Sequence, residues 1–136
     1  RVLFRSKALE AFAARTQPAL PVLAEGTEIA PESFIAVQVV PLNRGAGADL
    51  VEVTANLQQG VDADIAFSYA TCALAGWAKR NGEAYGRHVR TLQGTRDGKL
   101  TIGAAFTLSD QRPMGLRVME TEDTLRECKE RGIPAA

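Results

Sequence analysis

The chain has 136 residues, of which 46% are hydrophobic and 24% charged, with 12 glycines and 6 prolines. This length suits a single domain, and this composition excludes collagen-like and strongly disordered chains. Sixteen basic residues balance 16 acidic ones, so no overall electric field draws the protein to nucleic acid or to an anionic membrane.

The first part of the chain predicts a helix, a connector and two strands. Apolar residues share one side of a helical wheel from Val2 to Arg15, which predicts a helix. Three prolines and a glycine interrupt any helical pattern from Thr16 to Ser33, which is therefore predicted to be an extended connector. The β-branched run Phe34 to Val40 and the alternating run Leu50 to Leu57 predict strands. Glycines within Asn43 to Asp49 suit the turn between them.

A long central helix is predicted next. Asp62 or Asp64 can cap its first turn, and Arg80 followed by Asn81 and Gly82 is typical of a helix end. Apolar and small residues fall around most of its circumference, which predicts a helix that is buried nearly all round. Its uncharged run of 14 residues is shorter than the roughly 20 needed to cross a bilayer, so no membrane span is predicted.

The same helix predicts an interface between protein copies. One sheet cannot cover an apolar surface on so many sides, so a second helix or a second subunit is predicted to cover the other side. We expect a homo-oligomer, most simply a dimer. The small side chains would let another backbone approach closely. The predicted interface residues are Ala66, Ala70, Ala73 and Trp77.

The last part of the chain completes an α+β fold. Residues Ala84 to Gln93 and Lys99 to Leu108 predict a β-hairpin around the turn Gly94 to Gly98, and Met114 to Met119 predicts a short strand. A final helix is predicted from Thr121 to Gly132. The expected order over residues 1–136 is therefore α-β-β-α-β-β-(β)-α, a single domain with an antiparallel sheet packed on the central helix.

Cys72 and Cys128 are the two cysteines, and no CxxC or zinc-site spacing joins them. We therefore expect reduced thiols, no metal site and no cofactor. Cys72 lies among apolar neighbours, where burial raises the pKa of a thiol and makes it inert, so core packing is favoured. In the alternative interpretation, His88 on the following strand serves Cys72 as a base or ion-pair partner.

Basic residues concentrate on the predicted hairpin. Residues 77–117 carry 8 basic and 3 acidic side chains, whereas residues 1–76 carry 5 and 8. Side chains alternate along a strand, so Arg87 and Arg90 are predicted to point to opposite faces of the sheet, and His88 to the same face as Arg90. The predicted ligand-binding residues are therefore His88, Arg90 and Lys99, which would hold a small anionic ligand or an acidic protein partner. The alternative is a solvated surface without a ligand.

Nucleic-acid binding is not expected at this hairpin. Tyr85 is the one aromatic side chain of the basic cluster that could stack on a base, and no recognisable nucleic-acid-binding module is present.

The stretch Asp64 to Leu108 has a cysteine on a long apolar helix, then AKRNG, then a pair of strands with alternating apolar residues. In this order of features it resembles the second half of the osmotically inducible protein C-like thiol peroxidases. This resemblance implies that Cys72 is the peroxidatic residue and Cys128 the resolving one. The family's usual Cys-Pro at the second site is absent, because Lys129 follows Cys128.

The sequence as a whole favours a non-catalytic α+β module that associates with itself or with a partner protein. A thiol-dependent hydroperoxide reductase that uses Cys72, assisted by Cys128 or His88, is the alternative. We expect a soluble, cytoplasmic protein.

Overall fold

The computed structural model describes residues 20, 21, 23, 29–43, 49–114 and 118–135. The helix predicted from Val2 to Arg15 lies outside these residues. So do much of the predicted connector, residues 44–48 of the first turn and residues 115–117 of the predicted short strand.

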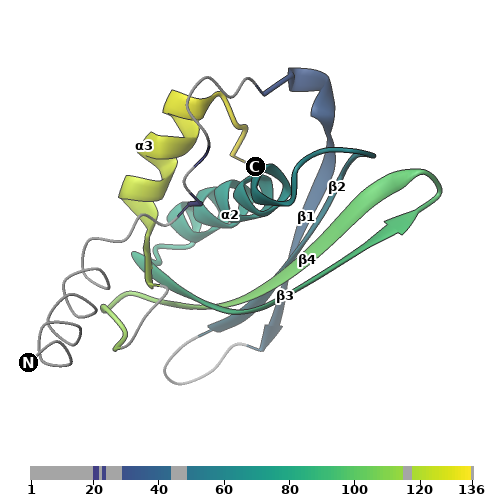
Figure 1. Cartoon of the computed structure of the whole chain (residues 1–136). Helices are drawn as coiled ribbons and strands as arrows, with labels where there is room; N and C mark the ends of the chain where they lie inside the picture. The colour runs from purple at the N-terminus through teal and green to yellow at the C-terminus, as the bar shows by residue number, and fades with distance from the viewer. Residues whose placement is uncertain (1–19, 22, 24–28, 44–48, 115–117, 136) are drawn as a thin grey trace, which may run out of the picture.

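Five antiparallel strands form one sheet in the order β1-β2-β4-β3-β5 (Figure 1). A short 3-10 helix, η1 (Pro31–Ser33), leads into the first of them. The strands are β1 (Phe34–Asn43), β2 (Asp49–Gln58), β3 (Tyr85–Arg96), β4 (Lys99–Ser109) and β5 (Val118–Glu120). Strand β1 is one edge of the sheet, and β5 covers only the first residues of β3, Tyr85 to Arg87, at the other edge.

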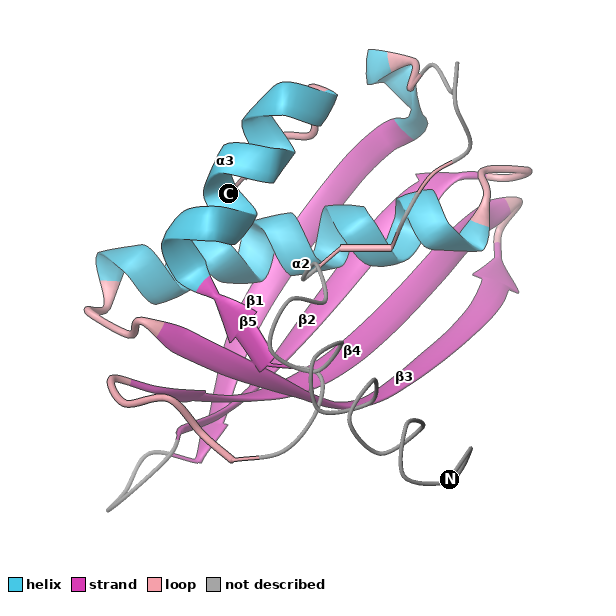
Figure 2. Ribbon diagram, turned by 60° about the vertical axis from the view of Figure 1, so that its left-hand side comes forward, coloured by secondary structure: helices cyan, strands magenta, loops and turns pink. Residues whose placement is uncertain are grey.

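The central helix α2 (Ala63–Arg80) lies in the concave face of this curled sheet (Figure 1). The Asp62 side chain accepts a hydrogen bond from the backbone N–H of Asp64 and so caps the first turn, as the sequence predicts. Helix α3 (Thr121–Arg131) packs on the side of α2 away from the sheet (Figure 2). The fold is therefore three layers deep at α3, and no described element covers the convex face of the sheet.

The core lies between the sheet and α2. Alternate residues of the two central strands point at the helix and are buried, as their apolar-polar alternation predicts. These residues are Val51, Val53, Ala55, Leu57, Ile102, Ala104, Phe106 and Leu108. The predicted α+β class and the predicted order of the described elements are confirmed.

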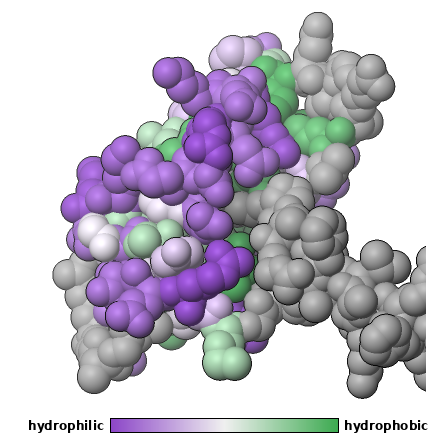
Figure 3. All heavy atoms as spheres, turned by 90° about the vertical axis from the view of Figure 1, so that its left-hand side faces the viewer, coloured by the Kyte–Doolittle hydropathy of each residue, from purple (hydrophilic) through white to green (hydrophobic). Residues whose placement is uncertain are grey.

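Helix α3 explains how the far side of α2 is covered. Its buried residues are Thr121, Thr124 and Cys128, and Cys128 is bonded to Cys72 of α2. The outward residues of α3 are mostly charged. Figure 3 shows the molecule from the side on which α3 lies, where hydrophilic residues predominate. Helix α3 therefore buries the apolar surface of α2 and presents a polar surface outward.

Among the described residues, no helix is both long enough and apolar enough to cross a membrane.

Candidate functional site

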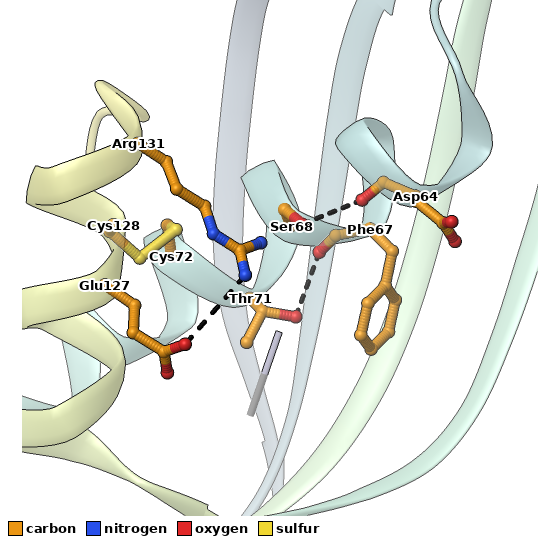
Figure 4. The surroundings of a disulfide bond; sticks show 8 residues. All are labelled: Asp64, Phe67, Ser68, Thr71, Cys72, Glu127, Cys128 and Arg131. Carbon is orange, nitrogen blue, oxygen red and sulfur yellow. Dashed lines mark hydrogen bonds and ion pairs between the residues drawn. A yellow bond between two sulfur atoms is a disulfide. The ribbon is translucent and has the colours of Figure 1, made fainter. Parts of the chain in front are cut away.

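Cys72 of α2 and Cys128 of α3 form a disulfide bond, with their Cα atoms 5.9 Å apart (Figure 4). The prediction of two reduced thiols is therefore wrong. The two residues lie 56 positions apart in the chain, so no short sequence motif predicts that they pair. Only the packing of α3 on α2 brings the two sulfur atoms together.

Both residues of the disulfide are buried, with 0% of Cys72 and 1% of Cys128 exposed. On α2, Ser68 and Thr71 donate hydrogen bonds to the backbone carbonyls of Asp64 and Phe67. A cross-link that is screened from solvent holds two helices together and is poorly placed to meet a substrate.

His88 does not lie beside Cys72. Its ring packs against Phe67 and Phe106, with ring centroids 5.1 and 5.3 Å apart, and it shares a hydrogen bond with Thr91. Phe106 belongs to the sheet, so His88 sits between the sheet and α2, whereas Cys72 points at α3. The structure therefore does not assemble the Cys72–His88 pair considered from the sequence.

The four predicted interface residues are covered by the chain itself. Ala66, Ala70 and Ala73 are fully buried and belong to the core, and Trp77 is half-buried at its edge. The second layer that the apolar helix requires is α3 of the same chain. An association surface must therefore be sought away from α2.

A β-bulge in β3 changes which residues of the basic hairpin point to each face of the sheet. The register of β3 on β4 shifts between His88 and Arg90, so that His88 pairs with Phe106 and Arg90 pairs with Ala105. Neighbouring residues of β4 point to opposite faces, so His88 points at the core and Arg90 points outward. The prediction that His88 shares the side of Arg90 is wrong, because simple alternation does not allow for the extra residue at the bulge.

The same bulge brings two arginines to one face. Arg87 pairs with Thr107, two positions from the partner of Arg90, so both guanidinium groups belong to the convex face. Lys99 also belongs to that face but lies six residues along β4 from Ala105, which is roughly 20 Å in a strand. The structure therefore brings Arg87 and Arg90 together, and separates both His88 and Lys99 from Arg90.

An uncharged edge strand is the feature that the sequence interpretation missed. Strand β1, FIAVQVVPLN, has no acidic or basic residue, and Ile35, Val40 and Leu42 are 38%, 38% and 51% exposed. Strand β3 exposes two further apolar residues, Val89 and Leu92. The lack of charge was visible in the sequence, but the edge position of β1 depends on the strand order.

An open, mainly apolar pocket of about 470 Å³ lies where β1 begins and α3 ends. The rings of Phe34 and Tyr69 pack there with centroids 4.6 Å apart. Burial raises the pKa of the Tyr69 phenol above its ordinary value, so the phenol is neutral at physiological pH. The lining residues are Pro31, Phe34, Tyr69, Gly132, Ile133 and Pro134.

No group of three or more potential metal-binding side chains occurs within the part of the chain that the structure describes.

The comparisons with known proteins cover most of the described fold. A family model described as the YNQ4 C-terminal domain matches residues 34–132, from the start of β1 to the end of α3. The chain is 56% identical over 134 residues to a Paracoccus denitrificans protein described as "Uncharacterized 26.9 kDa protein in nqo8 5'region". That match covers 97% of this chain and 52% of the relative, so the chain spans about half of the relative's length. No solved structure matches.

Proposed function

We propose that this chain, which belongs to the YNQ4 C-terminal domain family, is a non-catalytic domain that works by association and binds further copies of itself. The observation that carries the proposal is the uncharged edge strand β1 with its exposed apolar side chains. A long apolar strand at a sheet edge presents unpaired backbone groups and is a template for pairing with another chain.

The outer side of α3 and the free edge of β3 are less suited to self-association than β1, because both carry charged residues. The outer side of α3 is charged, and the long edge of β3 beyond β5 carries Arg90 and Arg96. Charged side chains on an edge protect it from pairing with other strands. Strand β1 has no charged residue among its ten, and its other interruptions, Pro41 and two register shifts on β2, lie toward its ends.

Self-association predicts a mass that rises with concentration. Sedimentation velocity of the chain over the micromolar range should show a species larger than the monomer, because burial of apolar side chains favours the assembled form. A single monomeric species at every concentration contradicts the proposal.

An anionic ligand is a second part of the proposed function. The bulge in β3 supports Arg87 and Arg90 as the residues that would hold it, because they share one face at neighbouring positions. We expect the Arg87→Ala, Arg90→Ala double variant to remain folded and to lose any salt-sensitive thermal shift caused by phosphorylated or carboxylate metabolites. Screening weakens such surface contacts at high salt. A shift that survives the double substitution, or one that added salt leaves unchanged, contradicts this site.

Hydroperoxide reduction at Cys72 is the second candidate function, and one observation favours it: Cys72 and Cys128 are bonded, as the two thiols of such an enzyme are after turnover. The burial of both residues favours a structural cross-link instead. Turnover of a hydroperoxide with a dithiol as electron donor separates the two functions. Turnover that the Cys72→Ala variant loses would establish the enzyme.

A further inference from the structure

We propose that two copies of this chain associate by antiparallel pairing of their β1 strands across a two-fold axis. The two five-stranded sheets would then form one continuous sheet, with both α2 helices on the same side of it. This inference rests on the proposed function and identifies both the surface and the partner.

The charge distribution selects a second copy as the occupant. Two-fold pairing places a strand opposite itself, so a charged residue near the axis meets a like charge, which is destabilising. Strand β1 has no charged residue and avoids this repulsion. The long free edge of β3 carries Arg90 and Arg96. Pairing of two copies along this edge would bring positively charged guanidinium groups together, which is unfavourable.

The inner row of β1 is incompletely covered in one copy. Val37 and Val39 pair with Ala55 and Val53 and point toward α2, as does Phe34. Their partners on β2 are fully buried, whereas these three residues are only partly buried. A second β1 strand alongside would cover the open side of this row and complete the core at the sheet edge.

The outer row of β1 also gains from the pairing. Val40 pairs with Glu52, which shares the convex face with Arg90, so Val40 points outward. Cross-strand contacts between β-branched side chains stabilise sheets. Pro41 lacks a backbone N–H, and the register of β1 on β2 shifts between Phe34 and Ala36. The new ladder therefore covers Ala36 to Val40, with Gln38 at its centre on the two-fold axis.

The test introduces a charge into β1. Gln38→Lys changes an exposed residue at the centre of the proposed ladder, so the fold should survive, as circular dichroism and the melting temperature will show. Like charges then face each other across the axis, and we expect the dissociation constant of the dimer to rise at least about tenfold. Leu92→Lys is the matched control, because Leu92 is 63% exposed on β3, outside the proposed interface.

A mixing experiment tests the two-fold symmetry. Gln38→Glu should weaken the dimer in the same way, and an equimolar mixture of the Lys and Glu variants should associate more tightly than either variant alone, because opposite charges then meet. Amide hydrogen exchange gives a second readout. Peptides that cover β1 should become more protected as the wild-type chain is concentrated, while peptides that cover residues 90–96 should not.

The outcomes separate this inference from the function on which it rests. A dimer that resists Gln38→Lys and is weakened by Leu92→Lys overturns the β1 interface and leaves self-association standing. A mixture that restores no association overturns the two-fold arrangement. A wild-type chain that stays monomeric, with β1 amides unprotected at every concentration, overturns both the interface and self-association.

Discussion

Reduction of the Cys72–Cys128 disulfide is expected to lower the free energy of unfolding by about 4 kcal/mol, because the bond closes a long loop. The cross-link limits the conformations of the unfolded chain, and a separation of 56 residues makes that restriction large. For a domain of this size, the melting temperature should fall by roughly 10–20 °C. Urea unfolding with and without a phosphine reductant measures the difference.

The Cys72→Ala, Cys128→Ala double variant is the control for this experiment. Its stability should match that of the reduced protein to within about 2 kcal/mol, the remainder being the small cavities that two buried truncations leave. Reductant should have no further effect on it. A wild-type protein that is equally stable with and without reductant refutes a structural role for the bond.

The redox state of the isolated protein also bears on its location. Structural disulfides form and persist in oxidising compartments and are rare in the cytosol. The cytoplasmic location expected from the sequence therefore stays a prediction, and thiol titration of the protein as purified from its native cell tests it.

Ala73→Glu is expected to unfold the domain or to destabilise it by at least about 3 kcal/mol, because an uncompensated carboxylate would enter the core. Ala73 is fully buried on α2, with the sheet on one side of the helix and α3 on the other. The larger side chain also has no space to occupy, which adds a packing penalty. Urea unfolding and near-ultraviolet circular dichroism measure the loss.

Ala63→Glu is the matched control, since it makes the same change in the same helix at an exposed position. A carboxylate in the first turn interacts favourably with the helix dipole, so this variant should be as stable as the wild type or slightly more stable. If Ala73→Glu leaves the monomer folded and changes only its association, Ala73 belongs to an interface between copies, as the sequence alone suggested.

Local patterns in the sequence were enough for most of the described elements. The apolar alternation of residues 50–57 and 99–108 predicted two strands with the correct inner faces, because side chains alternate along a strand wherever no residue is inserted. Asp62 and the Asn81–Gly82 pair predicted the ends of α2, because capping is an interaction between residues a few positions apart.

The same sequence predicted a helix buried on all sides but not what covers it. An apolar helix surface must be covered by other apolar groups, and α3 of the same chain or a second copy of the protein could cover it equally well. The alternation rule failed at His88 because one bulged residue reverses the faces that follow, and nothing in the local pattern marks it.

Three features depended entirely on the tertiary structure. The disulfide requires two cysteines 56 residues apart to meet, the Arg87–Arg90 pair requires the bulge, and the exposed edge of β1 requires the strand order. The α+β class, the central helix and the alternation of the strands could be predicted without the structure, since they follow from contacts between near neighbours. The sites follow from contacts between distant residues, which one sequence does not reveal until the chain is folded.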